Sequence, residues 1–287
     1  RRSFDFSKRR CLLNLPFLLT SEIVSSRIES VLILCRSDPT KDPRPRRMLE
    51  FCAERGIPTS TLCLPSSIGS KNLPFEYVGQ KPPLLKRPAR RLISALLLVV
   101  PTSDAIRLKI IDWAHGLKIR NDYFPASWSR LVVHDLELLP LAIRLAKGAP
   151  VYFDAREFYP KQNEESWFFR IFEMPTRQWL CERYLRKCKA IFTVSDGLRQ
   201  CYQNSFGVYS TVLRSVPNRK DLSPSPSSFN RIRLVHHGVA NKNRSISQLI
   251  EMTQWLDDRF SLDLYLTGKK RAIARLQRIA NCYEKVT

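Results

Sequence analysis

The chain has 287 residues, of which 44% are hydrophobic and 10% aromatic, enough to build one or two folded domains. Lys and Arg number 48 against 26 Asp and Glu, which gives a formal net charge of +22. This composition excludes a disordered, collagen-like or low-complexity chain, and the charge favours anionic partners such as phosphates, nucleic acid or an acidic lipid surface.

The excess of basic residues is spread along the whole chain, with no basic tail and no nucleic-acid-binding motif. We therefore expect no nucleic-acid partner. The eight cysteines form no Cys-x-x-Cys pair, which is typical of reduced thiols in a cytoplasmic protein. The longest apolar runs are shorter than the ~20 residues that span a bilayer, so we expect no transmembrane helix.

Residues 1–30 show no regular pattern and are interpreted as an irregular N-terminal extension. From residue 31, short β-rich runs alternate with segments of helical period, which predicts an α/β fold with a parallel sheet covered by helices. The expected strands are Val31 to Cys35, Thr59 to Leu64, Leu131 to Val133, Val151 to Phe153, Ala190 to Val194 and Thr211 to Arg214. The expected helices are Arg44 to Arg55, Leu138 to Lys147, Trp167 to Lys187 and Asp196 to Phe206.

Two further features of residues 31–222 bear on function, namely a basic helical segment and a serine between a strand and a helix. Residues 84–120 combine apolar residues at helical spacing with many basic ones, which indicates core helices with a solvated basic face or, alternatively, an interfacial membrane helix. Ser195 lies between a strand and a helix but lacks the Gly-x-Ser-x-Gly pattern of a nucleophile, so we interpret it as a helix N-cap.

A change of composition at residues 223–230, rich in Ser and Pro, predicts a linker between a domain at 31–222 and a second domain at 231–287. The alternation restarts there, with expected strands at Arg231 to His236 and Leu262 to Leu266 and expected helices at Ser245 to Asp257 and Lys269 to Tyr283. Because only two βα units follow the linker, we expect a truncated second domain and a fragment that is inactive alone.

Polar residues follow four of the predicted strands, at the end where ligands bind in a parallel sheet. They are Asp38, the pair His134 and Asp135, the segment Asp154 to Glu157, and the segment His236 to Gly238. Because these strand ends lie at the same edge of a sheet, the pattern predicts a shared cleft.

The sequence contains, in this order, LVVHDLELLPLAIRLAKGAPVYFDAREFYP, AIFTVSDGLRQCYQNSFGV, VLRSVPN, RLVHHGVANKNRSISQLIEMTQWL and LDLYLTG. Over residues 31–268 this series resembles the family 4 glycosyltransferases of the GT-B fold. The resemblance implies two Rossmann-like domains that face a cleft, the first for the acceptor and the second for a nucleotide-diphosphate sugar. It also implies a retaining transfer to a glycan or a lipid-linked acceptor, without a metal ion or other cofactor.

The resemblance further implies roles for individual residues of the first domain. His134 matches a position that contacts the transferred sugar and is the catalytic candidate; the alternative is a strand-end His that caps a helix or bonds the backbone. Asp38, Asp135, Asp154, Arg156 and Glu157 are expected in the acceptor-side cleft. Arg156 replaces a His of the family pattern, and the alternative there is that Arg156 or Arg177 forms a salt bridge with Glu157.

In the second domain, Gly238, Asn243 and Arg244 are expected to bind the donor, because a Gly permits close approach of a diphosphate and an Arg can bond two phosphate oxygens. Two glutamates that relatives place later in this domain are absent from the sequence. A noncatalytic acceptor-binding domain and a nucleotide-sugar epimerase of the same fold stay open as alternatives. The basic segment at 84–120 predicts peripheral contact with the inner face of an anionic membrane.

Overall fold

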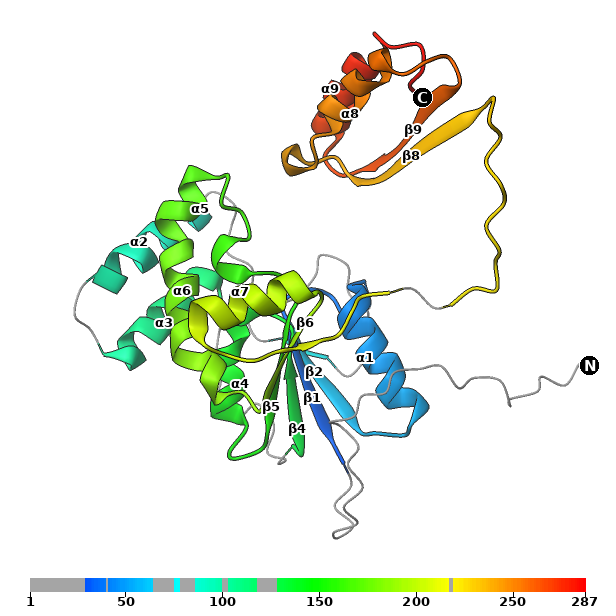
Figure 1. Cartoon of the computed structure of the whole chain (residues 1–287). Coiled ribbons are helices and arrows are strands. Elements are labelled where there is room, and N and C mark those ends of the chain that lie inside the picture. The colour runs from blue at the N-terminus through cyan, green and yellow to red at the C-terminus, as the bar shows by residue number, and fades with distance from the viewer. Residues whose placement is uncertain are drawn as a thin grey trace, which may run out of the picture. The chain divides into compact units, whose positions relative to one another are not determined.

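The computed structural model describes residues 29–39, 41–63, 75–77, 86–99, 103–117, 128–216 and 219–287. The chain divides into two compact units, Arg1–Val216 and Pro217–Thr287. The expected N-terminal extension at 1–30 therefore lies almost wholly outside the described residues. Each unit is an α/β structure, which confirms the fold class expected from the sequence (Figure 1).

The first unit is built on a sheet in which every described pair of neighbouring strands is parallel, in the order β3-β2-β1-β4-β5-β6-β7. The strands are β1 (Val31–Cys35), β2 (Thr59–Cys63), β3 (Phe75–Tyr77), β4 (Arg130–Val133), β5 (Val151–Ala155), β6 (Ala190–Thr193) and β7 (Thr211–Val212). Strand β1 lies between β2 and β4, and its Val31 pairs with Thr59 of β2 and Arg130 of β4. The reversal of strand order next to β1 is the place where ligands bind in such sheets.

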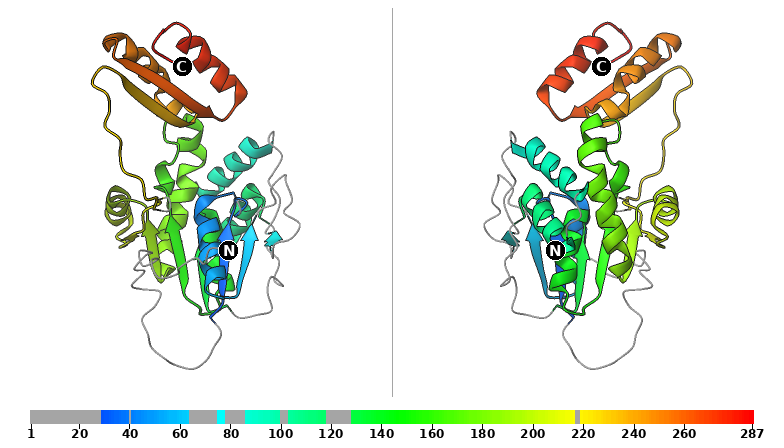
Figure 2. Two further views of the ribbon diagram at one scale, coloured as in Figure 1. Left: turned by 90° about the vertical axis from the view of Figure 1, so that its right-hand side faces the viewer. Right: turned by 90° about the vertical axis from the view of Figure 1, so that its left-hand side faces the viewer.

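Helices cover both faces of this sheet (Figures 1 and 2). They are α1 (Pro43–Glu54), α2 (Arg87–Val99), α3 (Asp104–His115), α4 (Leu139–Leu145), α5 (Trp167–Phe172), α6 (Met174–Tyr184) and α7 (Asp196–Phe206). Alternate strand residues point to opposite faces. Leu32 and Leu34 of β1 join a large core with residues of α3, α4, α6 and α7, whereas Val31 and Ile33 join a smaller core beneath α1.

Several predicted helices differ from the observed ones. The single helix expected at Trp167 to Lys187 is two helices, α5 and α6, because Pro175 lies in the first turn of α6 and has no N–H to continue the ladder of α5. Residues 84–117 hold α2 and α3, and α3 buries Leu108 and Ile111 in the core. Ser195 is the N-cap of α7, as predicted, and its Oγ accepts from the N–H of Leu198 at 3.3 Å.

The second unit contains two parallel strands, β8 (Ile232–Val239) and β9 (Phe260–Thr267), and two helices, α8 (Ile246–Met252) and α9 (Lys270–Ala280). The helices contact each other, and Ile246, Ile250 and Leu262 are its buried apolar residues. The strands extend further than the predicted Arg231 to His236 and Leu262 to Leu266, because their ladder runs from Ile232 paired with Phe260 to Val239 paired with Thr267.

Candidate functional site

A pocket of about 310 Å³ opens in the first unit at the carboxyl ends of three adjacent strands, β1, β4 and β5. Residues that follow β1, β4 and β5 make up most of its wall, and α6 adds one arginine. The lining residues are Arg36, Ser37, Asp135, Glu137, Arg156, Glu157, Tyr159, Gln162 and Arg177. Three guanidinium groups and three carboxyl groups thus surround one space, with an amide and two hydroxyl groups between them.

Glu137 forms the buried floor of the pocket. Its side chain is only 2% exposed, and its Oε1 lies 3.2 Å from Arg36 Nη1 and 3.2 Å from Arg177 Nη2. Burial alone would raise the pKa of this carboxyl group, but Arg177 and Arg36 outweigh that effect and hold the pKa of Glu137 well below its usual range. Glu137 is therefore a permanent negative charge that fixes two of the three arginines.

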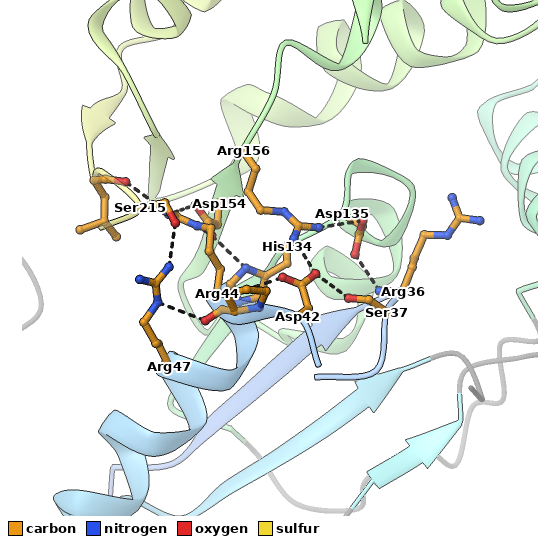
Figure 3. A network of polar contacts seen from close by, with 12 residues as sticks. Arg36, Ser37, Asp42, Arg44, Arg47, His134, Asp135, Asp154, Arg156 and Ser215 are labelled. Carbon is orange, nitrogen blue, oxygen red and sulfur yellow. Dashed lines mark hydrogen bonds and ion pairs between the residues drawn. The ribbon is translucent and has the colours of Figure 1, made fainter. Parts of the chain in front are cut away.

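Asp135 and Arg156 form a second charged pair in the pocket wall (Figure 3). The Oδ2 atom of Asp135 accepts from the backbone N–H of Arg36 at 2.7 Å, and its Oδ1 lies 3.5 Å from Arg156 Nη2. Arg156 Nη1 donates to Asp42 Oδ2 at 2.6 Å. Burial and the neighbouring charge of Glu137 raise the pKa of Asp135, whereas Arg156 lowers it. Arg156 is thus held between two carboxylates and has further N–H groups available to a ligand.

His134 lies beneath the pocket and not among the lining residues. Its side chain is 1% exposed, and its Nδ1 lies 2.9 Å from Asp154 Oδ2. Asp154 also accepts from Arg44, whose Nε lies 2.7 Å from the same Oδ2 (Figure 3). Burial raises the pKa of Asp154, but hydrogen bonds from His134 and Arg44 bring it down to about 2. His134 and Asp154 therefore belong to a buried ion-pair network and do not meet solvent.

The loop after β5 is held by two tyrosine hydroxyl groups. Tyr159 donates to the His134 carbonyl at 2.8 Å, and Tyr202 donates to the Glu157 carbonyl at 2.8 Å. The Glu157 side chain is exposed and lines the pocket. The alternative in which Arg156 or Arg177 pairs with Glu157 is wrong, because Arg156 binds Asp42 and Asp135 and Arg177 binds Glu137 and Glu173.

The structure thus brings together Asp135, Arg156 and Glu157 in the pocket, as the rule for strand ends predicted. It places Asp38 outside the lining, 3.7 Å from Lys41 Nζ, and it places Asp154 beneath the pocket with His134. Sequence reasoning missed Glu137, Gln162, Asp42 and Arg44. The signal for Glu137 was an acidic residue inside the apolar run LELLPLA, since a buried charge requires a charged partner.

In the second unit, Gly238 and Arg244 lie against each other near the end of β8. Gly238 has a φ of +148°, which side chains rarely adopt, and a Cβ there would lie 2.9 Å from Arg244 Nη1. Only glycine therefore leaves room for this guanidinium group over the backbone. Arg244 and Asn243 belong to a short 3-10 helix, Lys242–Arg244, and both are exposed.

The described residues contain no group of three or more His, Cys, Asp or Glu side chains arranged to hold a metal ion. Within the same part of the chain, no helix has the length and apolar character needed to cross a membrane.

No protein-family model and no curated protein matches the amino-acid sequence. Solved structures do match. The UDP complex of HepE from Anabaena has a TM-score of 0.54 at 12% identity, covering 90% of this chain and 68% of that chain. The lipopolysaccharide outer core galactosyltransferase WaaB has a TM-score of 0.53 at 10% identity, with coverage of 90% and 67%. TarM has a TM-score of 0.50 at 10% identity, with coverage of 91% and 76%. The chain therefore has a GT-B glycosyltransferase-like fold, as the resemblance predicted.

Proposed function

We propose that this protein is a glycosyltransferase that moves a sugar from a nucleotide-diphosphate sugar to a glycan or a lipid-linked acceptor. The observation that carries the proposal is the charged pocket at the carboxyl ends of β1, β4 and β5, in a chain with a GT-B fold. HepE, which has a similar fold, forms complexes with UDP and with UDP and glucose. A UDP-sugar is therefore the first donor to test.

The lining of the pocket suits the hydroxyl groups of an acceptor sugar. Each hydroxyl donates one hydrogen bond and accepts others, so a sugar needs donors and acceptors side by side. Arg36 and Arg156, each about a quarter exposed, supply donors. Glu157 supplies an exposed carboxylate that forms no ion pair among the described residues, whereas Asp135 and Glu137 are already bound by arginines. Glu157 is thus the carboxylate available to an acceptor hydroxyl, and the buried His134 supports the pocket from beneath.

Gly238 and Arg244 support a donor site in the second unit. The exposed Arg244 guanidinium lies against Gly238 and can bond two oxygens of a diphosphate at once. Asn243 precedes Arg244 in the same short helix and is exposed. In this proposal the second unit binds the nucleotide-diphosphate part of the donor, and the pocket of the first unit binds the acceptor.

The direct test is incubation with UDP-, GDP- and ADP-sugars and a mixture of acceptor glycans, with release of the nucleoside diphosphate as the readout. The sequence alone predicted an inactive fragment, whereas this proposal assigns an acceptor site and a donor site to the same chain. We therefore expect release with at least one donor to depend on acceptor and to persist when a chelator is added. We also expect the product to keep the anomeric configuration of the donor, which NMR spectroscopy measures. Glu157→Gln should raise the KM for the acceptor, whereas Glu164→Gln, at an exposed position nearby in the sequence, should leave it unchanged.

A second part of the proposal is that the first unit contacts an anionic membrane at the cytoplasmic inner face, where lipid-linked acceptors lie. It is supported by exposed apolar side chains on two helices that contact each other: Leu96 of α2 is 58% exposed, and Trp167 and Ile171 of α5 are 62% and 55% exposed. The basic residues of the 84–120 segment and the net charge of +22 add attraction to acidic lipids.

Co-sedimentation with vesicles tests this surface. The chain should bind vesicles rich in phosphatidylglycerol at low salt and should bind phosphatidylcholine vesicles weakly. The double variant Leu96→Ser with Trp167→Ser should lose most of the binding. The matched control is Trp255→Ser in the second unit, where the side chain is 82% exposed. Equal binding to both lipid compositions would contradict this part of the proposal.

A further inference from the structure

Helix α1 carries two arginines that bind the main chain at the end of the first unit. Arg44 Nη1 donates to the Leu213 carbonyl at 3.1 Å. Arg47 Nη2 donates to Ser215 Oγ at 2.7 Å, and its Nη1 donates to the Val216 carbonyl (Figure 3). Two side chains from one helix therefore hold the segment 213–216, which is about 170 residues away in the sequence.

This segment is the last anchored part of the chain before an exposed stretch. The N–H of Leu213 donates to the Thr193 carbonyl at 2.7 Å, and the Leu213 side chain packs against the smaller core beneath α1. Residues 219–228, by contrast, are all exposed and have almost no regular structure. The bonds made by Arg44 and Arg47 thus hold the last four residues of the first unit.

The amino end of the same helix reaches the pocket. Asp42, the N-cap of α1, accepts from Ser37 Oγ at 2.7 Å and from Arg156 Nη1 at 2.6 Å, and both donors line the pocket. Arg44 also binds Asp154, which binds His134 beneath the pocket. A continuous set of hydrogen bonds therefore joins the pocket to the segment 213–216 through one helix.

We propose that Arg44 and Arg47 are positioning residues for the transfer reaction, because they hold the segment 213–216 of the first unit and connect it to the acceptor pocket. This inference rests on the proposed function, since the reaction requires an acceptor held by one unit and a donor held by the other. Charged hydrogen bonds to main-chain carbonyls suit the task, because they hold the backbone whatever its side chains are.

The neighbouring Arg46 provides a matched control. It lies on the same helix, is half exposed, and pairs only with Glu50 one turn later among the described residues, at 3.6 Å. Arg47→Gln removes the two bonds to Ser215 and Val216, whereas Arg46→Gln removes a single surface ion pair. Neither residue lies in the pocket or in the buried network around Asp154, so both variants should fold.

The first measurement is hydrogen exchange of the full chain, followed by mass spectrometry. In Arg47→Gln, the amide of Leu213, which donates to the Thr193 carbonyl, should exchange about five to ten times faster, because the bonds lost at Ser215 and Val216 lower the free energy of local opening. Peptides from β1, β4 and β5 should be unchanged, and Arg46→Gln should match the parent protein throughout. Unchanged exchange at 213–216 in Arg47→Gln would overturn the proposal whether or not the chain is a transferase.

The second measurement is steady-state kinetics with the donor found in the screen. Arg47→Gln should lower kcat about tenfold or more while the KM for the acceptor stays within about twofold, since the residues that line the pocket are unchanged and only the segment 213–216 is released. Faster exchange with an unchanged kcat would refute the positioning role and leave a structural one. Absence of transferase activity in the parent protein would refute the proposed function and, with it, the role in catalysis, while the exchange experiment still decides whether the anchor exists.

Discussion

The buried ion-pair network around Asp154 yields a prediction whose magnitude follows from the structure. The pKa of Asp154 is about 2 in the folded chain, against an ordinary value of 3.8. Because the difference is nearly two pH units and each unit corresponds to about 1.4 kcal/mol, the ionised carboxylate contributes about 2 to 3 kcal/mol to the free energy of unfolding. We therefore expect Asp154→Asn to destabilise the first unit by at least this amount at neutral pH.

The loss can be larger, because the substitution leaves Arg44 without its carboxylate in a site where only 10% of its side chain is exposed. Removing one partner of a buried ion pair typically costs about 3 to 5 kcal/mol. The sign of the pH dependence also follows. The pKa of Asp154 is lower in the folded chain, at about 2, than its ordinary value of 3.8. The stabilisation by its carboxylate is therefore complete well above pH 3.8 and is lost as the pH falls through about 2. About half of the contribution should be gone at pH 3.

Urea denaturation followed by tryptophan fluorescence measures this change in the first unit, which holds four of the five tryptophans. Trp255 of the second unit is 82% exposed and changes its surroundings little on unfolding. Asp196→Asn is the control, because Asp196 is 52% exposed in its surface pairs with Arg199 and Arg214. A loss below about 1 kcal/mol at pH 7, or an equal loss at pH 7 and pH 3, would refute the network as described.

Three further predictions concern single residues. Arg244→Ala should weaken UDP binding by about 1.5 to 3 kcal/mol in calorimetric titration, while the exposed Arg275→Ala should not, and equal affinities would return Arg244 to an ordinary surface role. His134→Ala should lower the melting temperature together with activity, because its ring is 1% exposed and binds Asp154. Reduced turnover at an unchanged melting temperature would instead support a direct role of His134 in the reaction. Burial raises the pKa of Asp112 to about 6 despite Arg144, so the ionised form reduces stability as pH rises from about 4 to above 6. Asp112→Asn should then raise the unfolding free energy at pH 8 by about 3 kcal/mol and by much less at pH 4, which denaturation at both pH values tests.

The sequence predicted the elements whose pattern is local. Strand β1 and helix α7 were predicted with the observed bounds, because a short run of apolar residues defines the strand, and an N-cap followed by helical spacing defines the helix, without help from the rest of the chain. Strand β3 was not predicted, since it has three residues and pairs with one neighbour only. β3 forms by parallel hydrogen bonding to β2, which its own three residues do not indicate.

The candidate site was predictable only as far as strand ends define it. Asp135, Arg156 and Glu157 were found because they follow β4 and β5, whose carboxyl ends meet at one edge. Arg177 reaches the pocket from α6, and no local pattern indicates which face of that helix turns inward. The burial of His134 was not predictable either, because Tyr159 and the residues after β4 cover it only once the loop after β5 is folded back.

The distribution of charge along the sheet supports a ligand site more strongly than any single residue does. Among the described residues of β4 and β5, the buried charged groups lie at or beyond the carboxyl ends, as Glu137 and Asp154 do. The amino end of β4 instead has Arg130 paired with Glu29 near the surface. Buried ion pairs that only stabilised the fold would be expected at both ends of the strands. Apolar residues of similar volume would often stabilise the fold as well as such ion pairs, or better. Ligands, however, bind at the carboxyl ends of parallel strands. The one-sided placement is therefore the arrangement expected when buried charges are kept to orient Arg36, Arg156 and Arg177 toward a bound molecule.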